Sequence, residues 1–157
     1  MINFTPRFIK KNIEKIIHET AFDYMTSKVI TFKADQGIIE VIETITKRKI
    51  SGAPVINDNG EIIGIITEKD CLRLIYDEKY HNLPPNKGNV INYMSKKVVT
   101  VDYKTRIDEL ANMFMNSNFR RYPVIKNSKM VGIISRRDVL KACRKIKKTT
   151  WDLQKLT

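Results

Sequence analysis

The sequence predicts a mixed fold of the α/β (α+β) class, in which one β-α-β-β-α unit occurs twice. Three pairs of matching segments carry this prediction, and the members of each pair are separated by almost the same number of residues. The pairs are Tyr24-Met25-Thr26 with Tyr93-Met94-Ser95, Pro54-Val55-Ile56 with Pro123-Val124-Ile125, and 64–70 with 132–138. Repetition at a fixed spacing indicates one supersecondary unit used twice.

Each copy starts with a β-branched segment, at 29–32 and at 98–101, which favours a short strand. A helix is expected next, because apolar residues recur at helical spacing within 38–45 and 107–114. A strand, a turn and a second strand follow, and a last helix closes each copy.

Turn and cap signals separate these elements. Asp58-Asn59-Gly60 lies between two apolar runs and predicts a hairpin, whereas Asn127-Ser128-Lys129 is a shorter and weaker turn signal. Asp35 is expected to cap the first helix of its copy, and Thr105-x-x-Asp108 to form a capping box on the matching helix.

These signals divide the chain into five segments. The segments are an N-terminal helix at 1–23, a first repeat at 24–76, a linker at 77–92, a second repeat at 93–146 and a basic C-terminal tail at 147–157. The first helix is indicated by a proline near its start and by one apolar face, and the linker by its Asn, Pro and Gly residues.

Composition excludes several classes of protein. Of the 157 residues 42% are hydrophobic, which is enough for a core, yet no apolar run is long enough to span a bilayer. No secretory leader is visible, so we expect a cytoplasmic protein that does not bind membranes. The two cysteines form no CxxC pair and the two histidines lie far apart, so neither a metal site nor a disulfide is expected.

The formal net charge of +12 is unevenly distributed. Residues 24–75 hold seven basic and seven acidic side chains, residues 93–140 hold ten and four, and residues 141–157 hold six and one. This asymmetry favours a phosphate ligand or a polyanionic partner on the second half. A solvated surface rich in salt bridges is the alternative.

The repeated polar pattern has two interpretations. Thr67-x-x-Asp70 and Ser135-x-x-Asp138 each follow a strand and open a helix. They are capping boxes if the side chains only satisfy free backbone N–H groups. They form a nucleoside-phosphate site if the carboxylate accepts ribose hydroxyls and the helix start attracts phosphate.

The chain resembles a tandem pair of cystathionine β-synthase (CBS) domains over residues 24–146. The resemblance rests on the β-α-β-β-α order, the Met-[Thr/Ser] openings, the Pro-Val-Ile strand after Ile50-Ser51-Gly52-Ala53, and the two Gly-Ile-Ile-[Thr/Ser]-x-x-Asp motifs. It implies two repeats packed about a pseudo-two-fold axis, with two clefts that bind AMP, ADP, ATP or another adenosyl compound such as S-adenosylmethionine. It also implies a homodimer that forms a four-CBS disc and a separate effector protein.

The resemblance assigns residues to the two clefts. One cleft combines Ser135, Asp138 and Arg121 with Thr31 and Ile50. The other combines Thr67, Asp70 and Ala53 with Thr100 and Phe119.

The two clefts are not expected to be equivalent. Arg120-Arg121 stands where the first copy has Ser51-Gly52, and in similar proteins an arginine at the position of Arg121 reaches the ligand phosphates. We therefore predict that the Asp138 cleft binds the more phosphorylated ligand. The Asp70 cleft is expected to be empty or to hold a less charged adenosyl ligand.

Two other functions are alternatives to a ligand sensor. A nucleic-acid binder agrees with the basic second half and tail, although no helix-turn-helix, zinc-finger or aromatic RNA-binding motif is visible. An enzyme has no visible nucleophile–base pair and no phosphate-binding loop motif, so catalytic residues and a required cofactor are not expected.

Overall fold

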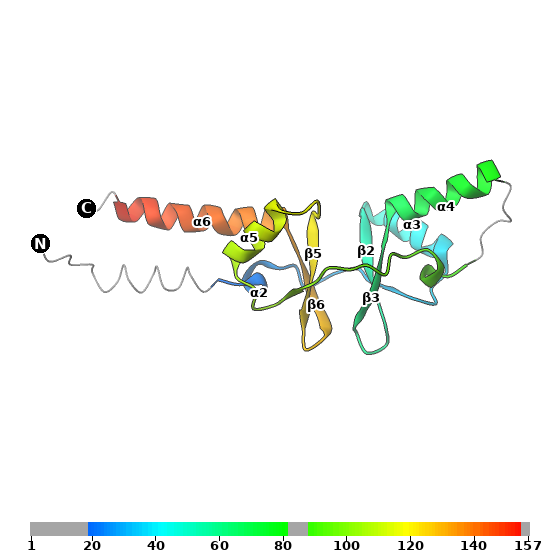
Figure 1. Cartoon of the computed structure of the whole chain (residues 1–157), viewed down its shortest axis with the longest axis horizontal. Helices are drawn as coiled ribbons and strands as arrows, with labels where there is room; N and C mark the ends of the chain where they lie inside the picture. The colour runs from blue at the N-terminus through cyan, green and yellow to red at the C-terminus, as the bar shows by residue number, and fades with distance from the viewer. Residues whose placement is uncertain (1–18, 82–87, 155–157) are drawn as a thin grey trace, which may run out of the picture. The chain divides into compact units, whose positions relative to one another are not determined.

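The computed structural model describes residues 19–81 and 88–154, and Figure 1 shows the order of their helices and strands. The chain divides into two units. Of the described residues, 28–99 and 126–130 form one unit, and 19–27, 100–125 and 131–154 form the other. We call them the N-terminal and the C-terminal unit after the repeat that supplies most of each. The helix expected within 1–23 lies outside the described residues, except for the short α2 (Ala21–Tyr24).

The N-terminal unit is built on a three-stranded sheet in the order β1-β2-β3. Its elements are β1 (Phe32–Lys33), α3 (Ile38–Arg48), β2 (Gly52–Ile56), β3 (Ile62–Thr67), α4 (Glu68–His81) and the 3₁₀ turn η1 (Val90–Asn92). β1 is parallel to β2, and β2 is antiparallel to β3.

The C-terminal unit repeats this arrangement with a sheet in the order β4-β5-β6. Its elements are β4 (Val101–Asp102), α5 (Ile107–Met115), β5 (Arg121–Lys126), β6 (Lys129–Ser135) and α6 (Arg136–Gln154), together with α2. The predicted mixed α+β fold with two β-α-β-β-α repeats is confirmed.

Each unit has a core of its own because its helices are amphipathic. Ile38, Val41 and Ile45 are the buried residues of α3, spaced so that they share one helix face. They pack in one cluster with Val55 and Ile66 of the sheet. The other unit has an equivalent cluster, in which Leu110 and Phe114 of α5 and Val139 of α6 pack with Val124 and Ile134 of the sheet.

Both hairpins have turns that suit their residues. Asn57 Oδ1 accepts hydrogen bonds from the backbone N–H groups of Asn59 and Glu61 at 3.0 and 2.9 Å, and Gly60 has φ +81°. The second turn places Asn127 and Ser128 at φ +50° and +65°. Positive φ at both central residues is typical of a tight hairpin turn, so the segment that looked weak in sequence forms one.

The first strand of each unit is shorter than predicted. Only Phe32 and Lys33 pair with β2, and only Val101 and Asp102 pair with β5. The β-branched residues before them lack such a partner, since β propensity forms a strand only where a neighbouring strand is present. Thr31 and Thr100 therefore lie just before β1 and β4.

The predicted caps of α3 and α5 are wrong. The N-cap of α3 is Gly37, without a side-chain hydrogen bond, so Asp35 does not cap it. The N-cap of α5 is Arg106, whose guanidinium binds Asp108 in a bidentate ion pair at 2.9 and 2.8 Å. This pair lowers the pKa of the Asp108 carboxyl and replaces the expected box with Thr105.

The segment between the repeats is more ordered than a linker. Helix α4 continues to His81, and Val90 is fully buried in the core of the N-terminal unit. Polar and proline residues predicted a loop across 77–92, but a helix and a core position occupy its two ends. Tertiary packing outweighs local loop signals here.

The two opening segments are exchanged between the repeats. Thr26 and Ile133 of β6 exchange backbone hydrogen bonds of 2.9 Å in each direction, so Tyr24-Met25-Thr26 belongs to the C-terminal unit. Ser95 pairs with Ile65 of β3 in the same way within the N-terminal unit. Each opening segment thus completes the unit whose sheet comes from the other repeat.

Candidate nucleotide-binding residues

The Ser135-Asp138 motif joins the end of β6 to the start of α6. Asp138 Oδ2 accepts hydrogen bonds from the Ser135 N–H at 3.0 Å and from the Ser135 hydroxyl at 2.6 Å. The Asp138 N–H donates back to Ser135 Oγ at 3.3 Å. The motif is therefore a complete capping box, as one of the two interpretations expected.

The Thr67-Asp70 motif has the same geometry at the start of α4. Asp70 Oδ2 accepts hydrogen bonds from the Thr67 N–H at 2.9 Å and from its hydroxyl at 2.6 Å, and the Asp70 N–H donates to Thr67 Oγ1 at 3.4 Å. All four side chains are half-buried.

Each capping box uses only one oxygen of its carboxylate, because the N–H and the hydroxyl of the Thr or Ser both donate to Oδ2. Among the described residues, Asp138 Oδ1 has only a long ion pair with Lys141 Nζ at 3.9 Å. A carboxylate oxygen can accept hydroxyl hydrogen bonds, and ribose offers two adjacent hydroxyls. The serine hydroxyl already donates its hydrogen to Asp138, so phosphate recognition at this motif requires donors from other residues.

Arginines supply such donors beside the second motif. The Arg136 N–H bonds to the carbonyl oxygen of Arg120 at 3.2 Å, which brings the start of β5 next to the start of α6. The side chains of Arg120, Arg121 and Arg136 are exposed there, and Arg136 donates to the Ser117 carbonyl at 2.8 Å. The first copy has the equivalent backbone hydrogen bond, from the Glu68 N–H to the Ser51 carbonyl at 3.1 Å, but no arginine at either position.

The backbone makes the two copies unequal at the position of Arg121. Gly52, its equivalent, has φ +150°, and a Cβ there would lie 2.6 Å from the Ile66 carbonyl oxygen. A side chain at position 52 is therefore excluded. Among the described residues only Lys49, Asn127 and Ser128 combine a side chain with positive φ, so Arg121 has ordinary strand geometry.

The remaining predicted site residues divide between the units. Thr31 and Ile50 are half-buried in the N-terminal unit, and Ile50 packs against its core. Thr100 and Phe119 belong to the C-terminal unit, where the Phe119 ring lies 5.6 Å from that of Tyr122. Ala53 is only 2% exposed, so its side chain is a core group. The joining of these sets into clefts stays a prediction from the resemblance.

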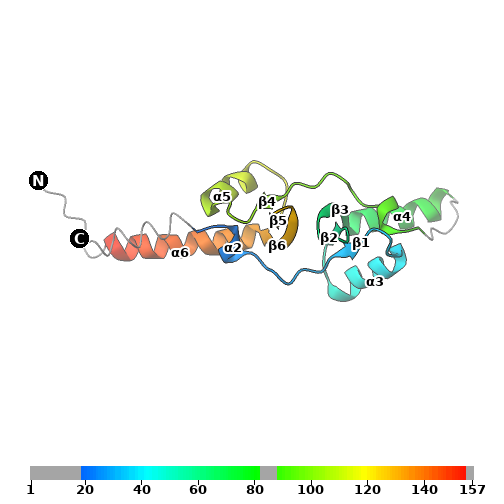
Figure 2. The same cartoon turned by 90° about the horizontal axis from the view of Figure 1, so that it is seen from below.

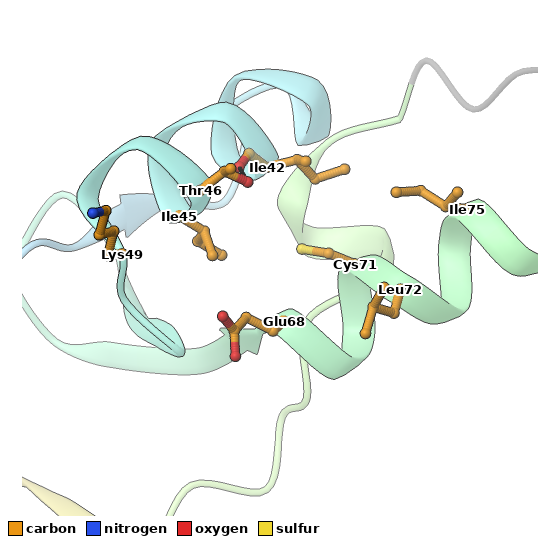
Figure 3. A pocket seen from close by; sticks show the side chains of 8 residues that line it. All are labelled: Ile42, Ile45, Thr46, Lys49, Glu68, Cys71, Leu72 and Ile75. Atoms are coloured by element: carbon orange, nitrogen blue, oxygen red, sulfur yellow. Dashed lines mark hydrogen bonds between the residues drawn. The ribbon is translucent and has the colours of Figure 1, made fainter.

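A groove that sequence reasoning missed runs between α3 and α4. It has a volume of about 600 Å³, and Figure 3 shows its lining: Ile42, Ile45, Thr46, Lys49, Glu68, Cys71, Leu72 and Ile75. Burial raises the pKa of the Cys71 thiol, so the thiol stays protonated at neutral pH. Asp70 lies on the opposite side of α4 from the lining residues, since successive residues turn by about 100°. The groove is therefore not the predicted site.

The C-terminal unit has a matching groove between α5 and α6, also of about 600 Å³. Leu140 stands at the position equivalent to Leu72, and the two are 68% and 67% exposed. The sequence signal for the two grooves was a leucine at the same position of each closing helix. Helical spacing alone does not show whether such a leucine is a core residue or an exposed one.

Comparison with known proteins defines the class. The CBS domain family model matches residues 21–77 and 90–145, so the chain belongs to the CBS domain family and is a tandem CBS pair. The protein MJ1225 of Methanocaldococcus jannaschii is 32% identical over 132 residues, covering 84% of this chain and 45% of its own length. This chain thus spans less than half of that relative.

Solved structures agree with the fold. Arabidopsis thaliana CBSX2, crystallised in complex with AMP, has a TM-score of 0.70 and 27% identity, covering 82% of this chain and 98% of that one. The CBS pair of MJ0100, solved with 5-methylthioadenosine and S-adenosyl-L-methionine, has a TM-score of 0.63 and 22% identity, covering 78% and 94%. The second similarity shows the fold alone.

Metal and membrane signals are absent from the described parts of the chain. Within residues 19–81 and 88–154, no group of three or more His, Cys, Asp or Glu side chains could hold a metal ion. No helix in these ranges is long and apolar enough to cross a bilayer.

Proposed function

We propose that the protein is a regulatory module that binds an adenine nucleotide or related adenosyl ligand and signals to a separate protein. The observation that carries the proposal is Asp138, at a helix start near exposed arginines, whose Oδ1 takes no part in the capping box and has only a long contact with Lys141 among the described residues. The AMP complex of CBSX2, a relative with the same fold, supports this class of ligand. The proposed role is binding and signalling without catalysis.

The charges define a chemical preference between the two motifs. Near Asp138 the exposed side chain of Arg121 can form charge-assisted hydrogen bonds with phosphate oxygens. Near Asp70 the corresponding residue is Gly52, which offers no cation. ATP, ADP or AMP is proposed for the Asp138 cleft. A less charged adenosyl ligand such as S-adenosylmethionine is proposed for the Asp70 cleft, where no ligand at all is the alternative.

Isothermal titration calorimetry tests this function directly. The full chain is titrated with AMP, ATP and S-adenosylmethionine at 50 and 300 mM NaCl. We expect saturable binding at both salt concentrations, with a stoichiometry that reports whether one or both clefts are occupied. Absence of saturable binding for all three compounds would overturn the proposal.

Arginine 121 is expected to control phosphate recognition. Because a hydrogen bond to a charged group contributes roughly 1.5–3 kcal/mol, Arg121→Ala should weaken ATP binding about 10- to 100-fold while adenosine affinity stays within a factor of about three. Arg120→Ala is the matched control, since it removes an adjacent exposed arginine. Equal losses for ATP and adenosine, or a larger loss in Arg120→Ala, would contradict the assignment.

A second copy of the chain is proposed to cover the two helical grooves, in agreement with the expected homodimer. The grooves lie at equivalent positions of both repeats, so identical chains can contact each other through the same surfaces. We expect Leu72→Asp combined with Leu140→Asp to convert a dimer into a monomer in sedimentation velocity experiments. Ile91→Asp, at a 47% exposed residue outside both grooves, should stay dimeric. A monomeric wild-type protein at 50 µM would reject this dimer.

A further inference from the structure

Helix α6 has three distinct faces. Val139 and Ala142 are buried in the core of the C-terminal unit, and Arg136, Leu140 and Cys143 line its groove. Arg137, Lys141 and Arg144 are exposed and form the third face, because residues spaced by three and four lie along one side of a helix. We call these three residues the cationic stripe.

Little among the described residues neutralises the cationic stripe. The Lys141 ammonium is 3.9 Å from Asp138 Oδ1, and its side chain is 69% exposed. Among the described residues, neither Arg137 nor Arg144 has an ion pair within 4.0 Å. Lys145, which follows the stripe, instead pairs with Glu19 at 3.3 Å and is not counted in it. Within the described part of the chain the stripe therefore has only this one long ion pair, and its exposed cations are available to an external anion.

The fold does not require the stripe, as the first repeat shows. The equivalent positions on α4 are Lys69, Arg73 and Tyr76, so the third cation is missing there. The next two residues of α4 in the sequence are acidic, Asp77 and Glu78. The equivalent helix of the first repeat, α4, therefore folds without a continuous cationic face. The fold of the repeat does not account for the stripe on α6.

We propose that the cationic stripe binds the phosphate backbone of a nucleic acid. From Arg137 to Arg144 the helix rises by about 10 Å, at about 1.5 Å per residue. One strand of duplex DNA carries a phosphate about every 3.4 Å of axis, so about three phosphates match the three cations. Figures 1 and 2 show α6 as one uninterrupted helix that extends beyond α5.

The faces of α6 argue against a lipid surface as the partner. A helix that lies in a membrane interface needs an apolar face directed to the lipid. Within residues 136–145, the part of α6 whose side chains are described, the apolar residues that oppose the stripe are Val139 and Ala142, and they face the protein core instead. Phosphate contacts need only exposed cations, and the net charge of +12 adds a favourable long-range field.

Fluorescence anisotropy with a labelled 20-base-pair DNA duplex of random sequence tests the proposal, at 25–200 mM NaCl. The test variant is Arg137→Ala/Lys141→Ala/Arg144→Ala, and Lys69→Ala/Arg73→Ala is the matched control on α4. Each phosphate contact contributes about 0.9 to the slope of log Kobs against log salt. The test variant should therefore show a slope shallower by about 2.7 and more than tenfold weaker binding at 100 mM NaCl, while the control keeps the wild-type slope.

Three outcomes would overturn the proposal. They are no duplex binding by the wild-type chain at 25 mM NaCl, equal slopes for the wild-type and test variants, or an equal loss in the control variant. Stripe-dependent binding to phosphatidylserine vesicles or to polyglutamate, with none to the duplex, would assign the stripe to a membrane or an acidic protein instead. Circular dichroism melting of both variants confirms that they are folded.

Discussion

Replacing Gly132 with alanine should lower the free energy of unfolding by about 2 kcal/mol, in the range of overpacking substitutions. The new Cβ would lie 2.8 Å from the Thr26 carbonyl oxygen and 2.7 Å from Met25 Sδ. The methionine can move, but the Thr26 carbonyl accepts the 2.9 Å hydrogen bond from the Ile133 N–H. Relief of the clash therefore breaks the pairing that holds the opening segment on β6. Chemical denaturation followed by circular dichroism measures the loss.

Gly37→Ala is the matched control for this substitution. No atom lies within 4 Å of the Cβ that it adds, and Gly37 has φ −65°, which suits alanine. Its stability should stay within about 1 kcal/mol of the wild type, the range of cap and chain-entropy effects. If Gly132→Ala and Gly37→Ala are equally stable, the opening segment does not pack on β6 as closely as the structure has it.

Removing the Asp138 carboxylate is expected to abolish nucleotide binding at the proposed arginine-flanked cleft. Two hydrogen bonds from ribose hydroxyls to a carboxylate contribute roughly 3 kcal/mol or more, so Asp138→Ala should weaken ATP and AMP binding by at least about 100-fold. The loss should be the same for adenosine, in contrast to Arg121→Ala, because ribose is common to all three. Calorimetric titration of the variant measures the change.

The first repeat provides the control for the structural part of this effect. Asp138→Ala also removes the hydrogen bonds to Ser135, which is expected to cost about 1 kcal/mol of stability. Asp70→Ala removes an equivalent cap, with hydrogen bonds of 2.9 and 2.6 Å, and should cost the same. If Asp70→Ala weakens ATP binding as much as Asp138→Ala does, the assignment of phosphorylated ligands to the Asp138 cleft is wrong.

The candidate site was partly visible in the sequence because its key contacts are local. Ser135 and Asp138 are three residues apart, so helix geometry predicts a capping box between them, which uses only one oxygen of the Asp138 carboxylate. The reason that Gly52 cannot carry a side chain was not visible. It depends on the close approach of the Ile66 carbonyl on the neighbouring strand, which local sequence does not report.

By itself, the sequence determined the repeated β-α-β-β-α order and the first hairpin turn, and it located the two motifs that form capping boxes, because periodicity, turn residues and short-range spacing decide them. Only the tertiary structure decided that the first strands shrink to two residues, that α4 continues to His81 and that Val90 is a core residue. Tertiary structure also decided that Tyr24-Met25-Thr26 completes the sheet of the other repeat. These features depend on backbone pairing and burial between residues far apart in the chain, and local propensity carries no information about such partners.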